Sequence, residues 1–266
     1  MTPQGVALVT GASSGIGEAF AEVFAAHGFD VVITARREAR LRAVQSRLTE
    51  RYGVRVDVIV EDLEDPTAPA RLCADLEARG LNIDVLVNNA GYGVPGSYVA
   101  SSWDVHERFL QIMVIAVTEL TRRLLPGMIE RRYGRIVNVA SLAGLVPAPA
   151  GHTLYAAAKA FLIKFSESLG HEVRRDGVFV TAVCPGFTFS EFHDITGTRA
   201  QMKKLPGFMW LSSTDVARQG YHAVMTGKSV VVTGRINSAI ATLVRILPQG
   251  LVIGIGRRMG RQYRKE

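Results

Sequence analysis

The sequence VALVTGASSGIG at residues 6–17 joins an apolar run of strand length to a glycine-rich turn that opens a helical pattern. Glycine allows a close approach of the backbone to a ligand, and the free N–H groups and positive dipole end of the following helix favour a pyrophosphate. The spacing is GxxxGxG, whereas the common dinucleotide fingerprint is GxGxxG. The turn therefore indicates a dinucleotide site, with a purely structural turn as the alternative. The residues expected at the cofactor are Gly11, Ser13, Ser14, Gly15, Ile16 and Gly17.

Apolar runs of strand length alternate with segments of helical period along the chain. The first helical segment carries apolar residues on one face from Ile16 to His27, and Gly28 is its expected end. Strands are expected at Val6–Thr10, Asp30–Thr34, Arg55–Val60, Asp84–Val87, Arg135–Ala140, Phe179–Cys184 and Ser229–Val232. This alternation predicts an α/β fold: a doubly wound, mostly parallel seven-stranded Rossmann-type sheet with helices on both faces.

The length of 266 residues and the hydrophobic content of 48% allow one large core. No repeat or linker divides the chain, so we expect a single domain. Residues 1–234 form its dinucleotide-binding and catalytic part, and residues 235–266 form a basic amphipathic C-terminal extension. The irregular insertion at residues 188–210 is expected to be a loop or short helices that act as a substrate lid.

The number and spacing of cysteines and histidines argue against a disulfide-rich protein and against a metal-binding protein. Two cysteines, Cys73 and Cys184, are too few for a disulfide framework and fit a reducing compartment. The N-terminal residues lack the features of an export signal, so we expect a cytoplasmic protein. No pair among the six histidines has the spacing of a metal site, and no metal is expected.

Arg36 and Arg37 follow the second expected strand, where NAD enzymes usually place an acidic residue for the ribose 2′-hydroxyl. A guanidinium can instead pair with a 2′-phosphate, so the sequence favours NADP over NAD. The alternative is that these arginines are simply solvated at a helix start. Positive charge opposes the helix dipole there, which favours the functional interpretation.

Two further polar clusters, Glu61-Asp62-Leu63 and Asn88-Asn89-Ala90-Gly91, follow the third and fourth strands. Ligands bind at the carboxyl edge of open α/β sheets. Each cluster alone could be turn chemistry.

Tyr155 and Lys159 lie four residues apart on one expected helical face, and Ser141 follows the fifth strand. Free tyrosine has a pKa of about 10, and a nearby ammonium favours the phenolate and lowers that pKa. Ser141 could donate a hydrogen bond to a substrate oxygen on which charge develops. The same spacing also occurs on ordinary helices, so position after the nucleotide-binding strands decides between the two interpretations.

Taken in order, these motifs and Pro185-Gly186 resemble the short-chain dehydrogenase/reductase family, in its single-domain NADP-dependent form, over nearly the whole chain. The resemblance implies that Tyr155 is the general acid/base, that Lys159 orients the nicotinamide ribose and lowers the tyrosine pKa, and that Ser141 positions the carbonyl. It places Asp62 at the adenine. The other residues that it places at or near the cofactor are Leu63, Asn89, Ala90, Gly91, Pro185, Gly186, Phe187, Thr188 and Ser190.

Met113 departs from the family pattern, which usually has asparagine at this point of a long helix. In the family a backbone carbonyl there is thought to hold a relay water, and the asparagine side chain stabilises a local kink. We expect Met113 to keep the carbonyl and weaken the kink, which would slow the enzyme without abolishing activity. The alternative is an alignment error of one helical turn.

The substrate side carries apolar residues, as ligand pockets usually do. A hydrophobic substrate is expected: a steroid-like molecule, a fatty aldehyde or a lipid-derived ketone. The same side chains could be ordinary core. The candidate substrate residues are Ser141, Tyr92, Leu142, Phe187 and Phe192.

The C-terminal part holds the excess positive charge. Residues 218–266 contain nine Lys/Arg and one Asp/Glu, a net charge of +8, so the rest of the chain is about neutral. An apolar stripe from Ile236 to Leu247 precedes the basic end, which suits peripheral contact with anionic lipid. A subunit interface or a helix packed on its own domain are the alternatives. Nucleic acid is not expected, because Tyr263 is the single aromatic residue in the basic run.

The sequence thus predicts an NADP-dependent oxidoreductase that acts as a homodimer or homotetramer on a small hydrophobic molecule. Two alternatives remain open. An NADP-binding sensor or scaffold would turn over little substrate, but such proteins often lose the Ser/Tyr/Lys set. A sugar-nucleotide epimerase or dehydratase would generally carry TGxxGxxG and a larger substrate region, and this chain has neither.

Overall fold

The computed structural model describes residues 4–94, 96–148, 151, 153–189, 210–247, 250 and 254. Within these residues the main strands are β1 (Val6–Thr10), β2 (Asp30–Ala35), β3 (Val56–Val60), β4 (Val85–Asn88), β5 (Gly134–Val139), β6 (Val178–Cys184) and β9 (Val230–Val232). They form one sheet in the order β3-β2-β1-β4-β5-β6-β9, in which every neighbouring pair is parallel. The seven predicted strands are confirmed to within one residue at each end. Because all of them run the same way, their carboxyl ends meet at one edge.

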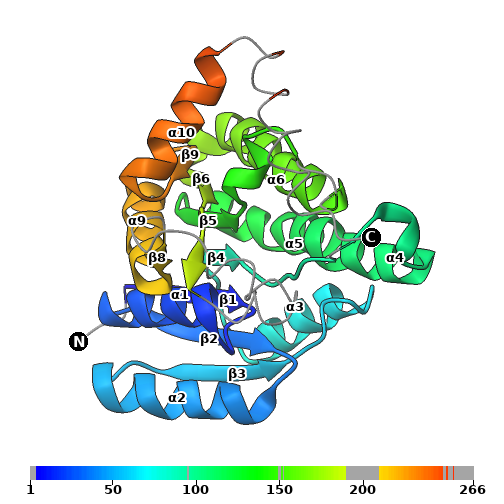
Figure 1. Ribbon diagram of the computed structural model, residues 1–266. Helices are drawn as coiled ribbons and strands as arrows, with labels where there is room; N and C mark the ends of the chain where they lie inside the picture. Colours follow the sequence, from blue (N-terminus) through cyan, green and yellow to red (C-terminus); the bar gives the residue numbers. More distant parts are fainter. Residues whose placement is uncertain are drawn as a thin grey trace.

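Helices cover both faces of this sheet (Figure 1). The helices on one face are α1 (Gly15–Ala26), α2 (Glu38–Tyr52) and α9 (Ser213–Met225). Those on the other face are α3 (Ala68–Ala78), α4 (Trp103–Leu110), α5 (Ala116–Glu130) and α6 (Thr153–Val173). The doubly wound architecture is therefore confirmed.

Each face of the sheet has its own hydrophobic core. On the α1 side, Phe24 stacks with Phe20 and makes edge contacts with Phe29 and Tyr221. Burial of one such side chain stabilises the fold by about 1.5–3 kcal/mol. The helix α1 ends as expected, since Gly28 has a φ of +79°. These packed layers hold the ends of β1 and β2 in fixed positions.

Helices α4 and α5 are joined by a π-helical turn, η2 (Gln111–Ile115). A π-turn is one of the recognised causes of helix kinks. Met113 is buried in this turn, and its Sδ occupies the space that a Cβ on Gly91 would need. A kink-forming element is thus present at Met113, and the π-turn extends on both sides of the methionine.

Short elements lie at the carboxyl edge of the sheet. They are η1 (Tyr98–Ala100), η3 (Leu142–Gly144), β7 (Thr188–Phe189), β8 (Leu211–Ser212) and α10 (Arg235–Ile246). A further short helix, η4 (Arg174–Asp176), precedes β6 at the other end of the strands.

The segment predicted to be a lid, residues 188–210, begins and ends at the carboxyl edge of the sheet. Strands β7 and β8 pair in parallel, so the two ends of the predicted lid lie side by side. Residues 190–209 of that lid lie outside the described residues. Among the helices that are described, none is long and apolar enough to cross a membrane.

Candidate active site

Thr10 and Asn89 hold the glycine-rich turn at the end of β1. Asn89 Nδ2 donates hydrogen bonds to the carbonyl oxygens of Thr10 (3.0 Å) and Gly11 (3.3 Å). Thr10 Oγ1 accepts hydrogen bonds from the backbone N–H groups of Asn89 (2.9 Å) and Ala90 (3.0 Å). These bonds tie the turn to the end of β4. Thr10 was not among the site residues predicted from the sequence, although it directly precedes the first glycine of the motif.

The start of α1 fits a phosphate group. A Cβ on Gly17 would overlap the carbonyl oxygen of Gly11, so only glycine lets the helix come this close to β1. Ser14 occupies the N-cap position, but its side chain makes no capping hydrogen bond. The first N–H groups of a helix have no partner within the helix, and an anion can bind them.

Arg36 and Arg37 follow β2 and take different positions. Arg37 Nη2 donates to Ser13 Oγ (3.0 Å) and to Ser14 Oγ (2.8 Å), which puts this guanidinium over the glycine-rich turn. Arg36 Nη1 instead pairs with Glu64 Oε1 at 2.8 Å. The structure therefore brings Arg37 to the expected phosphate site and gives Arg36 a carboxylate partner.

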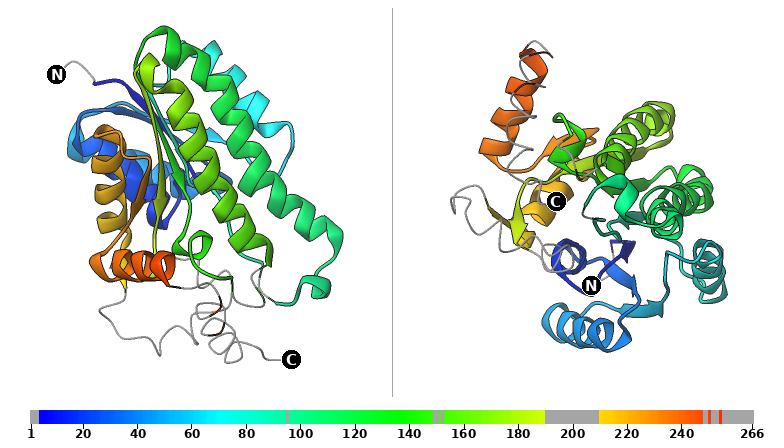
Figure 2. Two further views of the ribbon diagram at one scale, coloured as in Figure 1. Left: turned by 90° about the horizontal axis from the view of Figure 1, so that it is seen from above. Right: turned by 45° about the vertical axis from the view of Figure 1, so that its right-hand side comes forward.

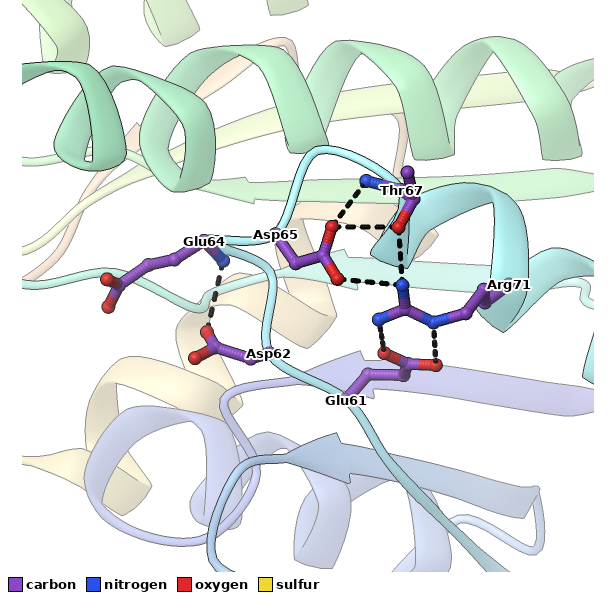
Figure 3. A network of polar contacts seen from close by, with 6 residues as sticks. All are labelled: Glu61, Asp62, Glu64, Asp65, Thr67 and Arg71. Carbon is purple, nitrogen blue, oxygen red and sulfur yellow. Dashed lines mark hydrogen bonds and ion pairs between the residues drawn. The ribbon is translucent and has the colours of Figure 1, made fainter.

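A polar network fixes the loop after β3 (Figure 3). Arg71 pairs with both carboxylate oxygens of Glu61, and its other amino group reaches Asp65 at 2.7 Å. Asp65 accepts hydrogen bonds from the backbone N–H and the hydroxyl of Thr67, and the backbone bond, followed by the bond from Arg71, lowers the pKa of Asp65 to about 2. Asp62 accepts a bond from the backbone N–H two residues on (3.1 Å) and keeps a half-exposed side chain. The loop thus holds Asp62 at the edge where the adenine is expected.

Three residues expected near the cofactor lie toward the core. Leu63 is buried in the cluster on the α3 side, and Ala90 packs against that cluster. Gly91 faces the Met113 side chain, which leaves no room for a Cβ. The side chains of Leu63 and Ala90 are therefore taken up by core packing.

Helix α6 and the residues after β5 bring Ser141, Tyr155 and Lys159 together. The Ser141 hydroxyl is hydrogen-bonded to the Tyr155 hydroxyl and also accepts a bond from the N–H of Ala143 (3.1 Å). Lys159 Nζ lies 5.7 Å from the centre of the Tyr155 ring and donates to the carbonyl oxygen of Val139 at 2.6 Å. The spacing in the sequence therefore corresponds to a real cluster.

Burial dominates the electrostatics of this cluster. Burial lowers the pKa of Lys159 to about 8, against a smaller opposite effect from Cys184. Burial also raises the pKa of Tyr155, and the hydrogen bond from Ser141 offsets only part of the rise. The lowered tyrosine pKa expected from Lys159 is therefore not found. The physical reason is that desolvation penalises the phenolate more than these partners favour it. Tyr155 thus carries its proton at neutral pH.

A chain of buried amides lies behind the cluster and was not predicted from the sequence. Asn88 Nδ2 donates to Asn138 Oδ1 (2.9 Å), and Asn138 Nδ2 donates to Ser166 Oγ (2.9 Å) on α6. Asn88 Nδ2 also reaches Thr121 Oγ1 (3.3 Å) on α5. This chain links the central strands to both neighbouring helices. A polar residue such as Asn138 inside an apolar strand was the available signal.

The residues after β6 run past the same cluster. The Pro185 carbonyl accepts a hydrogen bond from the N–H of Leu142 (2.8 Å), and Thr188 Oγ1 donates to the carbonyl of Gly186 (3.1 Å). A Cβ on Gly186 would lie 2.5 Å from the Asn237 side chain of α10. Ser190, the other expected cofactor residue here, lies outside the described residues.

A small pocket opens beside Tyr155. Its lining residues are Val94, Gly96, Ser97, Tyr98, His106, Phe109, Thr153, Leu154 and Tyr155. Of the expected substrate residues, Tyr92 packs edge-on against Phe109 in the pocket wall (5.8 Å between ring centres). Leu142 is in η3, and Phe187 contacts Trp210 (5.8 Å). Phe192 lies outside the described residues.

His106 is a polar wall of this pocket that was not predicted from the sequence. It is buried, its ring stacks on Tyr98, and its Nε2 lies 2.8 Å from the carbonyl oxygen of Tyr98. Its Nδ1 has no hydrogen-bond partner in the part of the chain that the structure describes. No spacing in the sequence marks this histidine.

A glycine-rich turn suited to a phosphate and a cluster of serine, tyrosine and lysine both lie at the carboxyl edge of a parallel sheet, an arrangement typical of dinucleotide-dependent oxidoreductases. Comparison with known proteins agrees, because residues 5–199 match the short chain dehydrogenase family. The chain belongs to the short-chain dehydrogenase family.

Several individual proteins are similar in sequence to this chain. A very-long-chain 3-oxoacyl-CoA reductase from Anas platyrhynchos is 39% identical over 196 residues, which cover 71% of this chain and 62% of that protein. The human protein of that name is 36% identical over 193 residues, with 71% and 61% covered. The chain thus spans about three fifths of these relatives. Nodulation protein G from Rhizobium sp. (strain N33) is 35% identical over 86% of this chain and 95% of that protein.

Solved structures share the whole architecture. A short-chain dehydrogenase from Sphingobium yanoikuyae in complex with NADPH superimposes with a TM-score of 0.80 at 30% identity, covering 92% of this chain and 96% of the other. The bulky-bulky ketone specific alcohol dehydrogenase from Comamonas testosteroni gives a TM-score of 0.76 at 29% identity, with 93% and 96% covered.

Proposed function

We propose that this protein is an NADP-dependent oxidoreductase that transfers a hydride between the nicotinamide and a carbonyl or secondary alcohol, with Tyr155 as the general acid/base. The observation that carries this proposal is the contact of Ser141, Tyr155 and Lys159 at the sheet edge that also holds the glycine-rich turn. A cofactor-binding protein without turnover is not favoured, because this cluster is intact.

The cofactor site of the proposal rests on Arg37 and the start of α1. The N–H groups of α1 suit the pyrophosphate, and the Arg37 guanidinium beside Ser13 and Ser14 suits a 2′-phosphate. Similar proteins such as the Sphingobium yanoikuyae dehydrogenase were solved with NADPH. Bound NADPH would supply the hydride.

The chain's own residues would supply the proton. Tyr155 donates its hydroxyl proton to the substrate oxygen during reduction, and its raised pKa keeps that proton in place at neutral pH. Ser141 binds the same oxygen and stabilises the charge that develops on it. Lys159, held by the Val139 carbonyl, provides positive charge behind the tyrosine.

The substrate would be hydrophobic and carry a ketone. The pocket beside Tyr155 is mostly apolar, and relatives are named as very-long-chain 3-oxoacyl-CoA reductases. We favour a 3-oxoacyl thioester or another lipid-derived ketone. We further propose a cytoplasmic homodimer or homotetramer, with peripheral membrane contact through the C-terminal extension.

The test is reduction of a panel of 3-oxoacyl thioesters, ketones and aldehydes, followed by the absorbance of NADPH. Tyr155→Phe should lose at least about a hundredfold in kcat, the usual contribution of a general acid, while NADPH binding stays unchanged. Tyr133→Phe is the matched control and should keep full activity, because the cation–π contact of that ring with Arg135 survives the change. Substantial turnover by Tyr155→Phe would refute the assignment.

A further inference from the structure

Helix α10 presents apolar side chains to solvent. Ile236, Leu243 and Ile246 are 40%, 56% and 75% exposed, and their spacing puts them on one face of the helix. The opposite face is fixed to the domain, since Asn237 is buried against Gly186 and donates to the carbonyl of Thr233 (2.8 Å). The exposed face is therefore not the one that anchors the helix.

The charged residues of α10 are both basic. Arg235 and Arg245 are exposed on α10, and the helix contains no Asp or Glu. In the sequence from residue 218 to residue 266, nine basic residues stand against one acidic residue. Two copies of this chain that met through α10 would bring like charges together, which disfavours a second copy as the partner.

A second apolar patch lies at the same edge of the molecule. Tyr98, Val99 and Trp103, from η1 and the start of α4, are 47%, 88% and 58% exposed. In the left view of Figure 2, α10 in orange and the start of α4 in teal lie at the edge where the strands end. Tyr98 also lines the pocket beside Tyr155. The η1–α4 patch thus borders the pocket beside Tyr155, and α10 lies at the same edge of the molecule.

We propose that this face docks on an anionic membrane surface, with α10 and the η1–α4 patch inserted among the headgroups and the active-site mouth turned toward the lipid. Apolar side chains next to arginines are the composition of interfacial helices, which gain from both apolar burial and attraction to anionic lipid. The proposal extends the proposed function, because a lipid-derived substrate would then enter from the surface. It does not depend on that function, since binding is measured without turnover.

The test is flotation of the full chain with vesicles of phosphatidylcholine, with or without phosphatidylglycerol. We expect binding to the anionic vesicles, loss of binding at high salt, and at least a tenfold weaker affinity for the double variant Leu243→Ser/Ile246→Ser. Arg235→Gln/Arg245→Gln should weaken binding to the anionic vesicles in the same sense. Val60→Ser, a matched change of an exposed apolar side chain on β3, should bind like the wild type.

Activity toward a small water-soluble ketone and circular dichroism check that each variant is folded, because none of these residues belongs to the catalytic cluster. Three results would overturn the proposal: no binding by the wild type, equal binding to both kinds of vesicle, or equal binding by the wild type and the α10 variant. If the wild type does not bind vesicles and the variant Leu243→Ser/Ile246→Ser has a different oligomeric state from the wild type, the face would be assigned to contact with a second copy instead. If the wild type and all variants lack reductase activity but the wild type binds vesicles as expected, the proposed function would fail and the docking proposal would remain.

Discussion

Replacement of Lys159 by methionine should abolish turnover and yet stabilise the cofactor-free protein. Burial lowers the pKa of Lys159 from 10.5 to about 8, so holding its charge in the folded state costs about 3 kcal/mol near pH 7. Methionine removes that cost but leaves the Val139 carbonyl without its donor, a loss of about 1 kcal/mol. The net gain in the free energy of unfolding should be about 2 kcal/mol.

The pH dependence distinguishes this reasoning from a simple packing effect. The folded pKa lies below the unfolded one, so the cost is fully present below the folded pKa and disappears as the pH rises through the unfolded pKa. Urea unfolding of wild type and Lys159→Met near pH 7 and at about pH 10 should show the advantage of the variant falling by about 2 kcal/mol or more. Lys164→Met, on the exposed side of the same helix, is the control and should show little change with pH. A stability difference between wild type and Lys159→Met that does not vary over this range would refute the idea that Lys159 titrates in the folded protein.

Three further outcomes are expected. Arg37→Ala should raise the KM for NADPH by about tenfold to a hundredfold and leave that for NADH nearly unchanged, since a charged hydrogen bond contributes about 1.5–3 kcal/mol; an equal effect on both cofactors would remove the 2′-phosphate assignment. Met113→Asn should change kcat by less than about threefold, because the π-turn is already present, and should lower the free energy of unfolding by about 1–3 kcal/mol for a buried amide; a large rise in kcat would show that the asparagine side chain itself contributes. Asn138→Leu should lower the unfolding free energy by about 1–3 kcal/mol, since Asn88 and Ser166 lose a partner, and equilibrium unfolding checks this against wild type.

The strands and the catalytic cluster could be predicted because their signals are local. Apolar runs such as Val6–Thr10 and Val178–Cys184 mark strands that are buried on both faces, and parallel pairing then brings their polar ends to one edge. Tyr155 and Lys159 share a helical face in any α-helix. Such features need no knowledge of distant residues.

The partners of individual side chains, and the effect of those partners on pKa, could not be predicted from local signals. Arg36 and Arg37 are adjacent in the sequence but have different partners. The difference arises because the fold brings the carboxylate of Glu64, from the loop after β3, to Arg36. The direction of the Tyr155 pKa depends on how far burial outweighs hydrogen bonding, which only the packed structure shows. The contact of the Met113 side chain with Gly91 likewise joins residues that are far apart in the sequence.

The buried amides of Asn88 and Asn138 have a consequence for how the molecule comes apart. If α6 moved away from the sheet while the rest stayed folded, Asn138 and Ser166 would lose their shared hydrogen bond inside an apolar layer. Opening of α6 alone is therefore disfavoured, and we expect the amide protons of this helix to exchange mainly on global unfolding. Tyr155 and Lys159 both lie on that helix. On heating or in denaturant, loss of catalysis and loss of the fold should then occur in one transition, with no inactive but still folded form between them.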